Sequence, residues 1–307
     1  MASEEQVNCN QCGANDYTVV FEKAESHHAV ELKDKYSAAK GVPCTDQVVR
    51  CNRCGLVYIN PRTSEDVILE SCADGDDEVY FSQAEGRIST FGSGLKWLEK
   101  FVPNKGKVLD VGCAAGFFLK VAKENGWDAK GVEPNRWLGE QGSKNYNVHI
   151  FSGYFEDAKL EDKSFDVVTM WDVIEHIPKP KEALKEANRV LKENGTLLVS
   201  TPDFSSVFAK MFGRRWWFFL SHHLFYFTPK TMGNMLKDSG FEVVKTKLHF
   251  QTLEIGYMIK MVKHLSKGGI VSSLCNGAMK VTDAVRLSKV KIPYYASQID
   301  IVAKKVR

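Results

Sequence analysis

The segment from Lys107 to Leu119 constrains the fold of this chain more than any other. Its apolar start, which includes Asp110, predicts a buried strand, and the small residues that follow predict a tight turn into a helix. A second apolar run, Ala129–Val132, leads directly into Glu133, which lies 23 residues after Asp110. A strand, a glycine turn, a helix and a second strand ending in an acid are the layout of a nucleotide-binding βαβ unit.

The composition of the turn argues against a nucleotide bound through its phosphates. A dinucleotide turn uses G-x-G-x-x-G before the helix, because the pyrophosphate binds free N–H groups at the helix N-terminus. Here the turn reads Gly112-Cys-Ala-Ala-Gly116-Phe117, and Asp110 would place a negative charge near any phosphate. The turn therefore disfavours NAD and ATP. It suits a cationic ligand with a ribose and no phosphate, such as S-adenosylmethionine.

The same residues carry a resemblance to a known family. Asp110-Val-Gly-Cys-Ala-Ala-Gly116 resembles the first motif, D-x-G-x-G-x-G, of the class I S-adenosylmethionine-dependent methyltransferases, and it departs from that motif only at Ala114. Further segments resemble the later parts of the family pattern in the correct order: Ser164–Pro180, Leu191–Asp203 and His223–Val243. The last of them resembles the group that includes ubiquinone-biosynthesis O-methyltransferases and deoxysugar methyltransferases.

Strands and helices alternate along most of the chain, which predicts an α/β fold with a doubly wound, mostly parallel sheet. The resemblance implies a seven-stranded Rossmann-like sheet whose last strand is antiparallel. Helices are expected over residues 79–101 and 181–192, and another begins with Thr228 as its N-cap and Pro229 in its first turn. The expected strands are Lys107–Val111, Ala129–Glu133, Val148–Phe151, Phe165–Trp171, Thr196–Thr201, Phe241–Lys247 and Gln298–Lys304.

Four cysteines near the N-terminus form two Cys-x-x-Cys pairs, Cys9 with Cys12 and Cys51 with Cys54, each followed by a glycine. Four thiolates at this spacing predict a tetrahedral structural zinc site in a zinc-ribbon-like module. Disulfides are the alternative, which a reducing cytoplasm disfavours. We therefore expect a zinc-binding module over residues 1–62 and a methyltransferase domain over residues 63–307. In the deoxysugar methyltransferases that this chain resembles, similar cysteine-rich modules help close the substrate pocket.

The resemblance implies which residues hold S-adenosylmethionine. The cofactor would lie against Asp110 and the glycine turn, with Glu133 on the ribose hydroxyls. Tyr80 or Arg87 would contact the methionine carboxylate. The remaining implied positions are Gly112, Ala114 and Gly116 in the turn, Phe155 beside adenine with Glu156 or Asp157 on its exocyclic amine, and Trp171 and Asp172 beyond the fourth strand.

Two histidine positions compete for the role of general base, a role that suits histidine near neutral pH. His176 follows the fourth strand, and His222 and His223 lie in a later segment where relatives usually show Glu-His. The aromatic run Trp216–Leu220, preceded by Arg214 and Arg215, suggests a mobile lid with a basic lip; the alternative is that the run packs in the core.

A helical insertion is expected at about residues 250–295, before the last strand. It would contain helices over residues 255–265 and 270–287. Its cationic side chains suit either a solvated cap over the pocket or peripheral contact with an anionic membrane. These residues are Lys260, Lys263, Lys267, Lys280, Arg286, Lys289 and Lys291.

Composition limits the remaining choices. The net charge is +3, which is too small to indicate nucleic-acid binding by itself. The N-terminal residues MASEEQVNC show no basic region followed by an apolar stretch, so we expect a cytoplasmic protein. The favoured function is O-methylation of a small-molecule, sugar or glycoconjugate acceptor. The alternatives are C- or N-methylation of a nucleotide-linked sugar, RNA methylation, and a degenerate methyltransferase fold that only binds.

Overall fold

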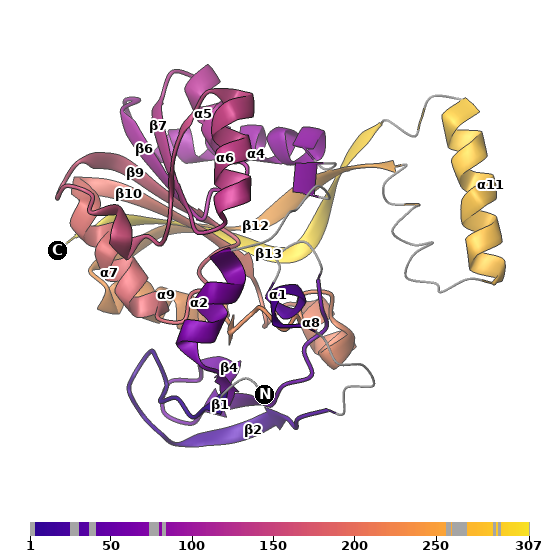
Figure 1. Ribbon diagram of the computed structural model, residues 1–307, viewed down its shortest axis with the longest axis horizontal. Coiled ribbons are helices and arrows are strands. Elements are labelled where there is room, and N and C mark those ends of the chain that lie inside the picture. Colours follow the sequence, from indigo (N-terminus) through magenta and orange to yellow (C-terminus); the bar gives the residue numbers. More distant parts are fainter. Residues whose placement is uncertain are drawn as a thin grey trace.

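A sheet of seven strands forms the centre of the computed structural model (Figure 1). The model describes residues 4–24, 31–36, 41–73, 80–81, 84–255, 259, 269–284, 287 and 290–306. In chain order the strands are β6 (Lys107–Val111), β7 (Asp128–Glu133), β8 (His149–Ser152), β9 (Phe165–Trp171), β10 (Leu191–Pro202), β12 (Phe241–Glu254) and β13 (Lys291–Lys305).

The strands lie in the order β12-β13-β10-β9-β6-β7-β8. Neighbouring strands from β8 to β10 are parallel, whereas β13 is antiparallel to both β10 and β12. The predicted α/β class and the antiparallel last strand are therefore confirmed. The chain leaves β6 in one direction to form β7 and later returns to its other side as β9, so the sheet has a switch point at β6. Ligands bind at the carboxyl ends of strands beside such a point.

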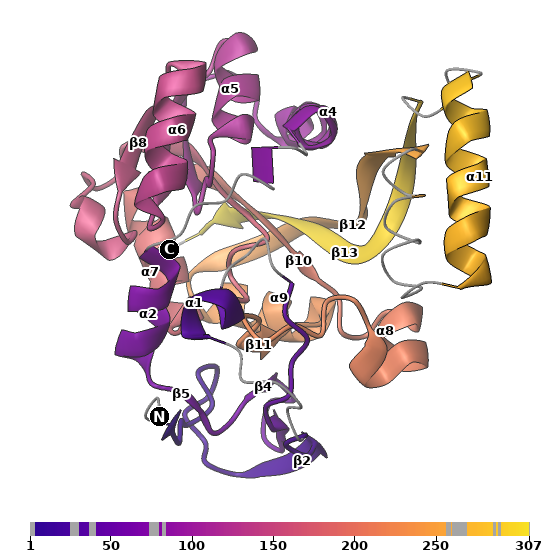
Figure 2. The ribbon, with the colours of Figure 1, turned by 45° about the vertical axis from the view of Figure 1, so that its right-hand side comes forward.

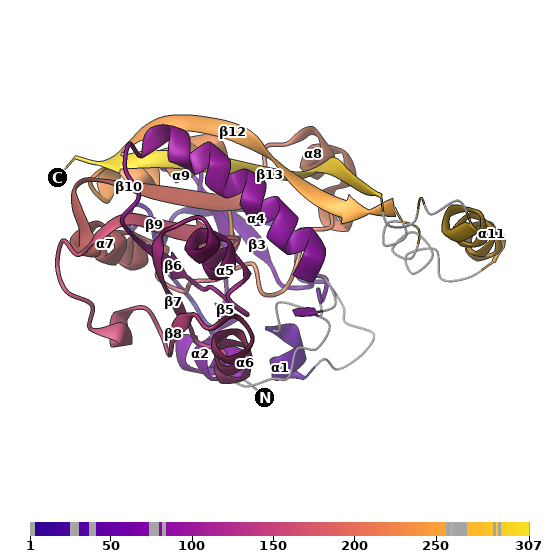
Figure 3. The same cartoon turned by 90° about the horizontal axis from the view of Figure 1, so that it is seen from above.

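Helices cover both faces of this sheet, as Figure 3 shows from above. Because side chains alternate across a strand, Val108 packs with α4 and α5, whereas Leu109 packs with α7 and α9. The predicted N-cap at Thr228 is present as a capping box with Thr231. The helices and short 3₁₀ turns are α4 (Ala84–Leu98), η1 (Glu99–Phe101), α5 (Phe117–Glu124), α6 (Arg136–Tyr146), η2 (Glu156–Ala158), α7 (Pro180–Val190), α8 (Val207–Phe212), η3 (Gly213–Arg215) and α9 (Pro229–Asp238).

The N-terminal residues form a second, smaller sheet beside the carboxyl edge of the first. Its order is β11-β4-β3-β2, so β11 (Phe225–Tyr226), which comes from the C-terminal half of the chain, completes it. Val49 and Leu56 belong to the same buried cluster as residues of the large sheet. The division at residue 62 stays a prediction. The other N-terminal elements are β1 (Glu4–Glu5), β2 (Tyr17–Phe21), α1 (Leu32–Lys35), β3 (Val48–Cys51), β4 (Val57–Ile59), β5 (Arg62–Thr63) and α2 (Glu65–Ala73).

The segment before the last strand differs from the expected helical insertion at both ends. Strand β12 continues to Glu254 and β13 begins at Lys291, and these two residues are paired in one long antiparallel hairpin. Cross-strand pairing of polar and aromatic side chains, such as Gln251 with Tyr294, accounts for the extension. One predicted helix is present as α11 (Ile270–Ala284), which stands away from the body in Figures 1 and 2. The other, over residues 255–265, falls almost wholly outside the described residues.

Candidate active site

A cavity of about 1260 Å³ opens at the carboxyl ends of β6, β7 and β9. This volume exceeds the roughly 300–1,000 Å³ of an ordinary ligand pocket, so it can hold two molecules side by side. All of the residues proposed from the sequence for cofactor binding or catalysis line it, except Gly116 and Asp157. Its walls come from the strand ends, from α1 and α2, from the N-terminal part of α4, from the loop before β11 and from the β12–β13 hairpin.

The turn after β6 brings the backbone close to its neighbours. Gly112 has a φ of +67°, and a Cβ atom added there would lie 2.6 Å from a methyl group of Val173. Ala114 adopts a left-handed φ of 47°, which costs an L-residue roughly 1–2 kcal/mol. Gly116 begins α5, and a Cβ on it would press against Ile150 and Val148. Gly116 therefore serves the packing of α5 against the β8 region and does not face the cavity.

The carboxylate of Glu133 links the ends of two strand–helix units. Its Oε2 accepts a hydrogen bond from the backbone N–H of Ala114 at 2.7 Å, and its Oε1 accepts one from Asn135 N–H at 2.8 Å. Asn135 in turn caps α6, because its Oδ1 accepts from Leu138 N–H. The acid thus holds the first turn and the start of α6 in place, while its oxygens remain at the cavity wall.

Asp110 is a second buried acid, with only 3% of its surface exposed. The Thr169 hydroxyl of β9 donates to its Oδ1 at 2.7 Å. Burial raises the pKa of Asp110 to about 8, and the nearby charge of Glu133 adds to this rise although the Thr169 hydrogen bond opposes it. Burial also raises the pKa of Glu133 to about 7, against the opposing effect of its two backbone donors. A cation in the cavity would favour the ionised form of both acids.

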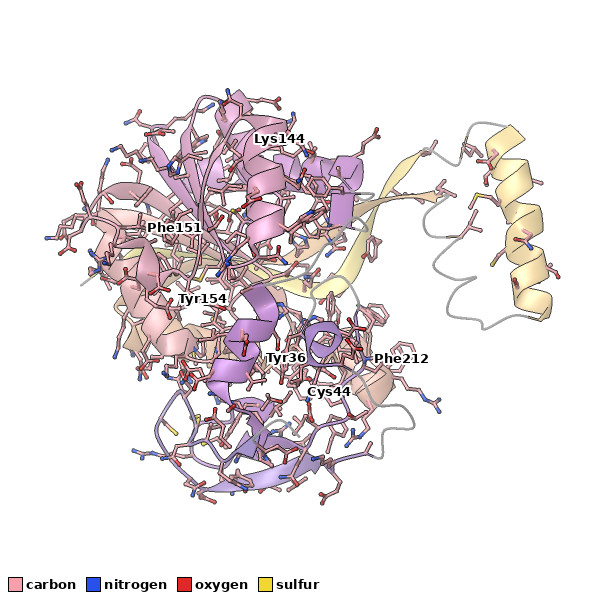
Figure 4. All side chains as sticks on the ribbon, in the orientation of Figure 1. Tyr36, Cys44, Lys144, Phe151, Tyr154 and Phe212 are labelled. Carbon is pink, nitrogen blue, oxygen red and sulfur yellow. The ribbon has the colours of Figure 1, made fainter. Side chains whose placement is uncertain are left out.

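An aromatic side chain and an acid follow β8 on the next part of the wall. Phe155 is buried and lines the cavity together with Glu156, whereas Asp157 is not among the lining residues. Tyr154, labelled in Figure 4, donates its hydroxyl to the carbonyl of Leu69 in α2. This hydrogen bond ties the wall after β8 to the helix that follows the small sheet.

Aromatic rings from α4 and its approach cover the other side of the turn. Tyr80 stacks on Phe117 with ring centroids 5.3 Å apart, and the Arg87 guanidinium lies 4.2 Å above the Tyr80 ring. Trp171, at the end of β9, packs edge-on against Phe91. The next residue, Asp172, accepts a hydrogen bond from Gln298 Nε2 of β13 and lines the same space.

Sequence reasoning missed His249, which also lines the cavity. Its Nδ1 lies 2.7 Å from Oδ1 of the buried Asp300. The pKa of His249 is lowered by burial, but the hydrogen bond and charge of Asp300 outweigh that effect and raise it. Polar residues at alternate positions of β12 and β13, His249 with Gln251 and Gln298 with Asp300, were the signal that could have found this wall.

The three histidines proposed as bases lie together at the end of the cavity nearest the small sheet. Their ring centroids are 4.7 Å apart for His222–His223, 4.8 Å for His176–His223 and 4.9 Å for His176–His222. Burial lowers the pKa of His176 to about 4 and holds the pKa values of His222 and His223 well below the usual range. The imidazoles are therefore neutral near pH 7, the form that can accept a proton or bind a metal.

Part of the segment expected to be a mobile lid packs in the protein interior. Trp216 and Phe219 are buried with Val57 and Ile59 of the small sheet. The backbone of this segment is also bonded to the N-terminal residues, because Phe219 O accepts from Cys44 N–H. Only Trp217, Phe218 and Leu220 of the run line the cavity. The run is therefore divided between the core of the small sheet and the cavity wall, and a lid that moves stays a prediction.

The four predicted metal-binding cysteines converge at the far end of the small sheet. The sulfur atoms of Cys9, Cys12, Cys51 and Cys54 all lie within 4.8 Å of one another. Cys9 Sγ is 3.4 Å from Cys54 Sγ, and Cys12 Sγ is 3.5 Å from Cys51 Sγ. Sulfurs on one tetrahedral zinc lie about 3.8 Å apart, given Zn–S bonds of about 2.3 Å. The donor set and its spacing fit a zinc ion.

Comparison with known proteins agrees with this geometry. Residues 81–246 match a family model described as a methyltransferase domain. The chain is 36% identical over 105 residues to a ubiquinone biosynthesis O-methyltransferase of Idiomarina loihiensis, covering 31% of this chain and 42% of that protein. It is 32% identical over 104 residues to a sarcosine/dimethylglycine N-methyltransferase of Aphanothece halophytica, covering 31% and 38%. The match spans less than half the length of each of these two relatives.

The fold also agrees with that of a solved structure. An S-adenosylmethionine-dependent methyltransferase from Archaeoglobus fulgidus aligns with 75% of this chain and 100% of its own, at a TM-score of 0.51 and 20% sequence identity. At that identity the likeness concerns the fold alone. Among the described residues, no helix is both long and apolar enough to cross a membrane.

The raised pKa of Asp110 predicts a pH-dependent cost to the ligand-free protein. The folded protein keeps this proton up to about pH 8, whereas the unfolded chain loses it near pH 4, so stability falls as pH rises between the two. Asp110→Asn retains an acceptor for Thr169 and removes the charge. We expect its free energy of unfolding to exceed that of the wild type increasingly from pH 5 to pH 8, reaching several kcal/mol at about 1.4 kcal/mol per pKa unit.

Urea denaturation of both proteins across this pH range, without ligand, measures the difference. Asp128→Asn, at an exposed position at the start of β7, is the matched control and should show no such trend. A constant difference between Asp110→Asn and wild type from pH 5 to pH 8 would contradict the account of a buried acid that holds its proton.

Proposed function

Because the chain belongs to the methyltransferase domain family, we propose that it transfers the methyl group of S-adenosylmethionine to an oxygen of a small-molecule or saccharide acceptor. The observation that carries this proposal is the pair of buried acids, Asp110 and Glu133, at the switch point of the sheet. The hydrogen bonds to these acids come from neutral donors, the backbone N–H groups of Ala114 and Asn135 and the hydroxyl of Thr169. A sulfonium ligand would supply the missing positive charge.

The chain's own residues divide the cavity into a cofactor half and an acceptor half. In the cofactor half, Glu133 would accept from the ribose hydroxyls, and the turn of Gly112 and Ala114 would lie against the methionine portion. Phe155 would flank the adenine while Glu156 accepts from its amine. The remaining contacts would come from Tyr80, Arg87, Trp171 and Asp172. When bound, S-adenosylmethionine supplies a methyl group already activated by positive sulfur.

The acceptor half contains the chain's candidates for proton removal. An acceptor hydroxyl becomes a stronger nucleophile when a neighbouring base takes its proton. The neutral imidazoles of His176, His222 and His223 face this half of the cavity and can accept that proton. Trp217 and Phe218 give the same half an apolar wall, which excludes water and suits an acceptor with an aromatic or sugar face.

We also propose that the four-cysteine cluster holds a structural zinc ion. A site with four thiolates has no open position for a substrate, so this ion would stabilise the small sheet and take no part in the reaction. Cys9 N–H donates to Ala14 O, and Cys51 N–H donates to Leu56 O. Each of these hydrogen bonds closes the turn that contains one Cys-x-x-Cys segment. A cytoplasmic location, where thiols stay reduced, remains our proposal for the compartment.

Peripheral membrane contact through the basic insertion stays a prediction. Helix α11 stands apart from the body and exposes Leu274 and Val281, which are 66% and 63% exposed. An exposed apolar strip of this kind favours a binding surface. Most of the insertion's lysines and arginines fall outside the described residues.

The cofactor site is tested by substituting Glu133. Glu133→Gln loses the charge that would bind the ribose hydroxyls. Its side-chain N–H₂ group would also replace one of the two oxygens that accept from the backbone N–H groups of Ala114 and Asn135. Each charge-assisted hydrogen bond contributes about 1.5–3 kcal/mol, so affinity for S-adenosylmethionine should fall by about 100-fold or more. Titration calorimetry measures this loss. Glu140→Gln, on the exposed side of α6, should bind as the wild type does, and equal affinity of both variants would refute the assigned site.

The zinc site is tested by Cys54→Ser. We expect this variant to bind cobalt without the strong thiolate-to-metal absorption of a four-sulfur site, and to lose amide protection in β2, β3 and β4 during hydrogen exchange. The large sheet should keep its protection. Cys275→Ser, in α11, changes a cysteine away from the cluster and serves as the control. Unchanged cobalt absorption in Cys54→Ser would rule out a tetrathiolate ion.

A further inference from the structure

We propose that His176, His222 and His223 form a second metal site, which binds a divalent transition ion of the zinc type inside the acceptor half of the cavity. The three side chains each offer one ligand atom, and these atoms lie within 4.8 Å of one another. All three residues also line the cavity, so an ion held here would be reached directly by an acceptor. The site is separate from the four-cysteine cluster.

The distances between the rings are those that a shared ion needs. Zn–N bonds of about 2.0–2.1 Å place three imidazole centroids about 5 Å apart around one ion. The observed separations are 4.9 Å for His176–His222, 4.8 Å for His176–His223 and 4.7 Å for His222–His223. Two of the three ring pairs are nearly perpendicular, at 78° and 82°, so the rings do not form a stacked column. The third pair, His176–His222, is closer to parallel, at 21°.

Two of the histidines are oriented by the backbone in the manner of metal ligands. His176 Nδ1 lies 3.1 Å from the carbonyl oxygen of His222, and His223 Nδ1 lies 2.8 Å from that of Phe218. A carbonyl can only accept, so each Nδ1 carries the proton and each Nε2 presents a lone pair. A ligating histidine almost always donates its other N–H to such an acceptor, which fixes its tautomer and ring direction.

Two further polar atoms beside the cluster lack partners among the described residues. The Nδ1 atom of His222 is buried without a hydrogen bond, and so is Oε1 of Glu175. That oxygen lies 4.0 Å from His176 Nε2, while the other oxygen of Glu175 accepts from the Thr201 hydroxyl at 3.0 Å. A buried polar atom left unpaired costs about 1–3 kcal/mol. An ion would satisfy the imidazole, and Oε1 of Glu175 would lie close enough to act as a further ligand.

The proposed site would act differently from the cysteine cluster. Three imidazoles leave at least one coordination position open toward the cavity, which is the pattern of catalytic zinc rather than structural zinc. A hydroxyl bound at that position loses its proton more readily, because the cation stabilises the oxyanion. On this point the inference rests on the proposed function, and it narrows the acceptor to a molecule whose reacting oxygen can bind a metal. With the ion bound, the imidazoles would be ligands, and the proton of the acceptor hydroxyl would pass to water.

Metal stoichiometry tests the site without reference to methyl transfer. Zinc is titrated into protein that has been dialysed against a mild chelator, and bound metal is counted by elemental analysis after gel filtration. The wild type should bind two equivalents, one of them in the cysteine cluster. His223→Gln and His222→Gln should each bind one, with affinity for the second equivalent reduced by more than about 100-fold, since even changes outside the ligand shell cost 10–100-fold. His149→Gln, at an exposed position in β8, should bind two.

Cobalt identifies the ligands of the second equivalent. It should add ligand-field absorption without the thiolate-to-metal absorption that marks the cysteine cluster. A histidine variant that keeps the thiolate-to-cobalt absorption of the cysteine cluster is folded. If one of the two variants loses this absorption together with that of the second equivalent, the test rests on the other variant. A wild-type stoichiometry of one at saturating zinc, or two equivalents in both histidine variants, would overturn the proposal. Calorimetry with S-adenosylmethionine on the same samples reports separately on the cofactor site.

Discussion

Two carboxyl groups are buried where β6 and β7 end, and the arrangement of the cavity depends on how each is held. Glu133 takes backbone N–H groups from the turn after β6 and from the start of α6, so one side chain sets the spacing of two strand–helix units. Asp110 is held from the opposite side by the hydroxyl of Thr169 in β9. Three neighbouring strands are thereby joined through two acids at the switch point, where a parallel sheet can receive a ligand. Burial of these acids disfavours their charged forms until a cation arrives.

The small N-terminal sheet contributes to the same cavity because the chain returns to it late. The backbone oxygen of Glu175, in the loop after β9, accepts from Leu224 N–H and Phe225 N–H, where β11 begins. β11 then pairs with β4. These contacts bring His222 and His223 beside His176, although 46 residues separate His176 from His222 along the chain. The small sheet is completed by β11 and carries the four-cysteine cluster at its far end. It therefore supports the end of the cavity where the three histidines lie.

The sequence predicted the parts of this molecule that are governed by local pattern. The strands around Asp110 and Glu133 and the N-cap at Thr228 are local signals, and each has its predicted structure. The two Cys-x-x-Cys pairs converge as their spacing predicted. The seven-stranded sheet and its antiparallel last strand followed from the family resemblance.

What the sequence could not predict depends on pairing between distant segments. The long β12–β13 hairpin was mistaken for helix because its strands meet only across an insertion. The packing of Trp216 could not be predicted because its partner is a strand more than 150 residues earlier, and nothing local indicates that contact. The histidine cluster and the pair of His249 and Asp300 likewise arise from strand register and loop docking.

Proton release on cofactor binding tests the central claim most directly. Titration calorimetry at pH 7, in buffers that differ in ionisation enthalpy, counts the protons exchanged when S-adenosylmethionine binds. If the sulfonium compensates Asp110 and Glu133, whose pKa values are raised to about 8 and about 7, binding must release protons, and S-adenosylhomocysteine, which lacks the positive sulfur, should release fewer. Binding of both ligands with no proton release would contradict the account, because the two acids would then not be the groups that hold the cofactor.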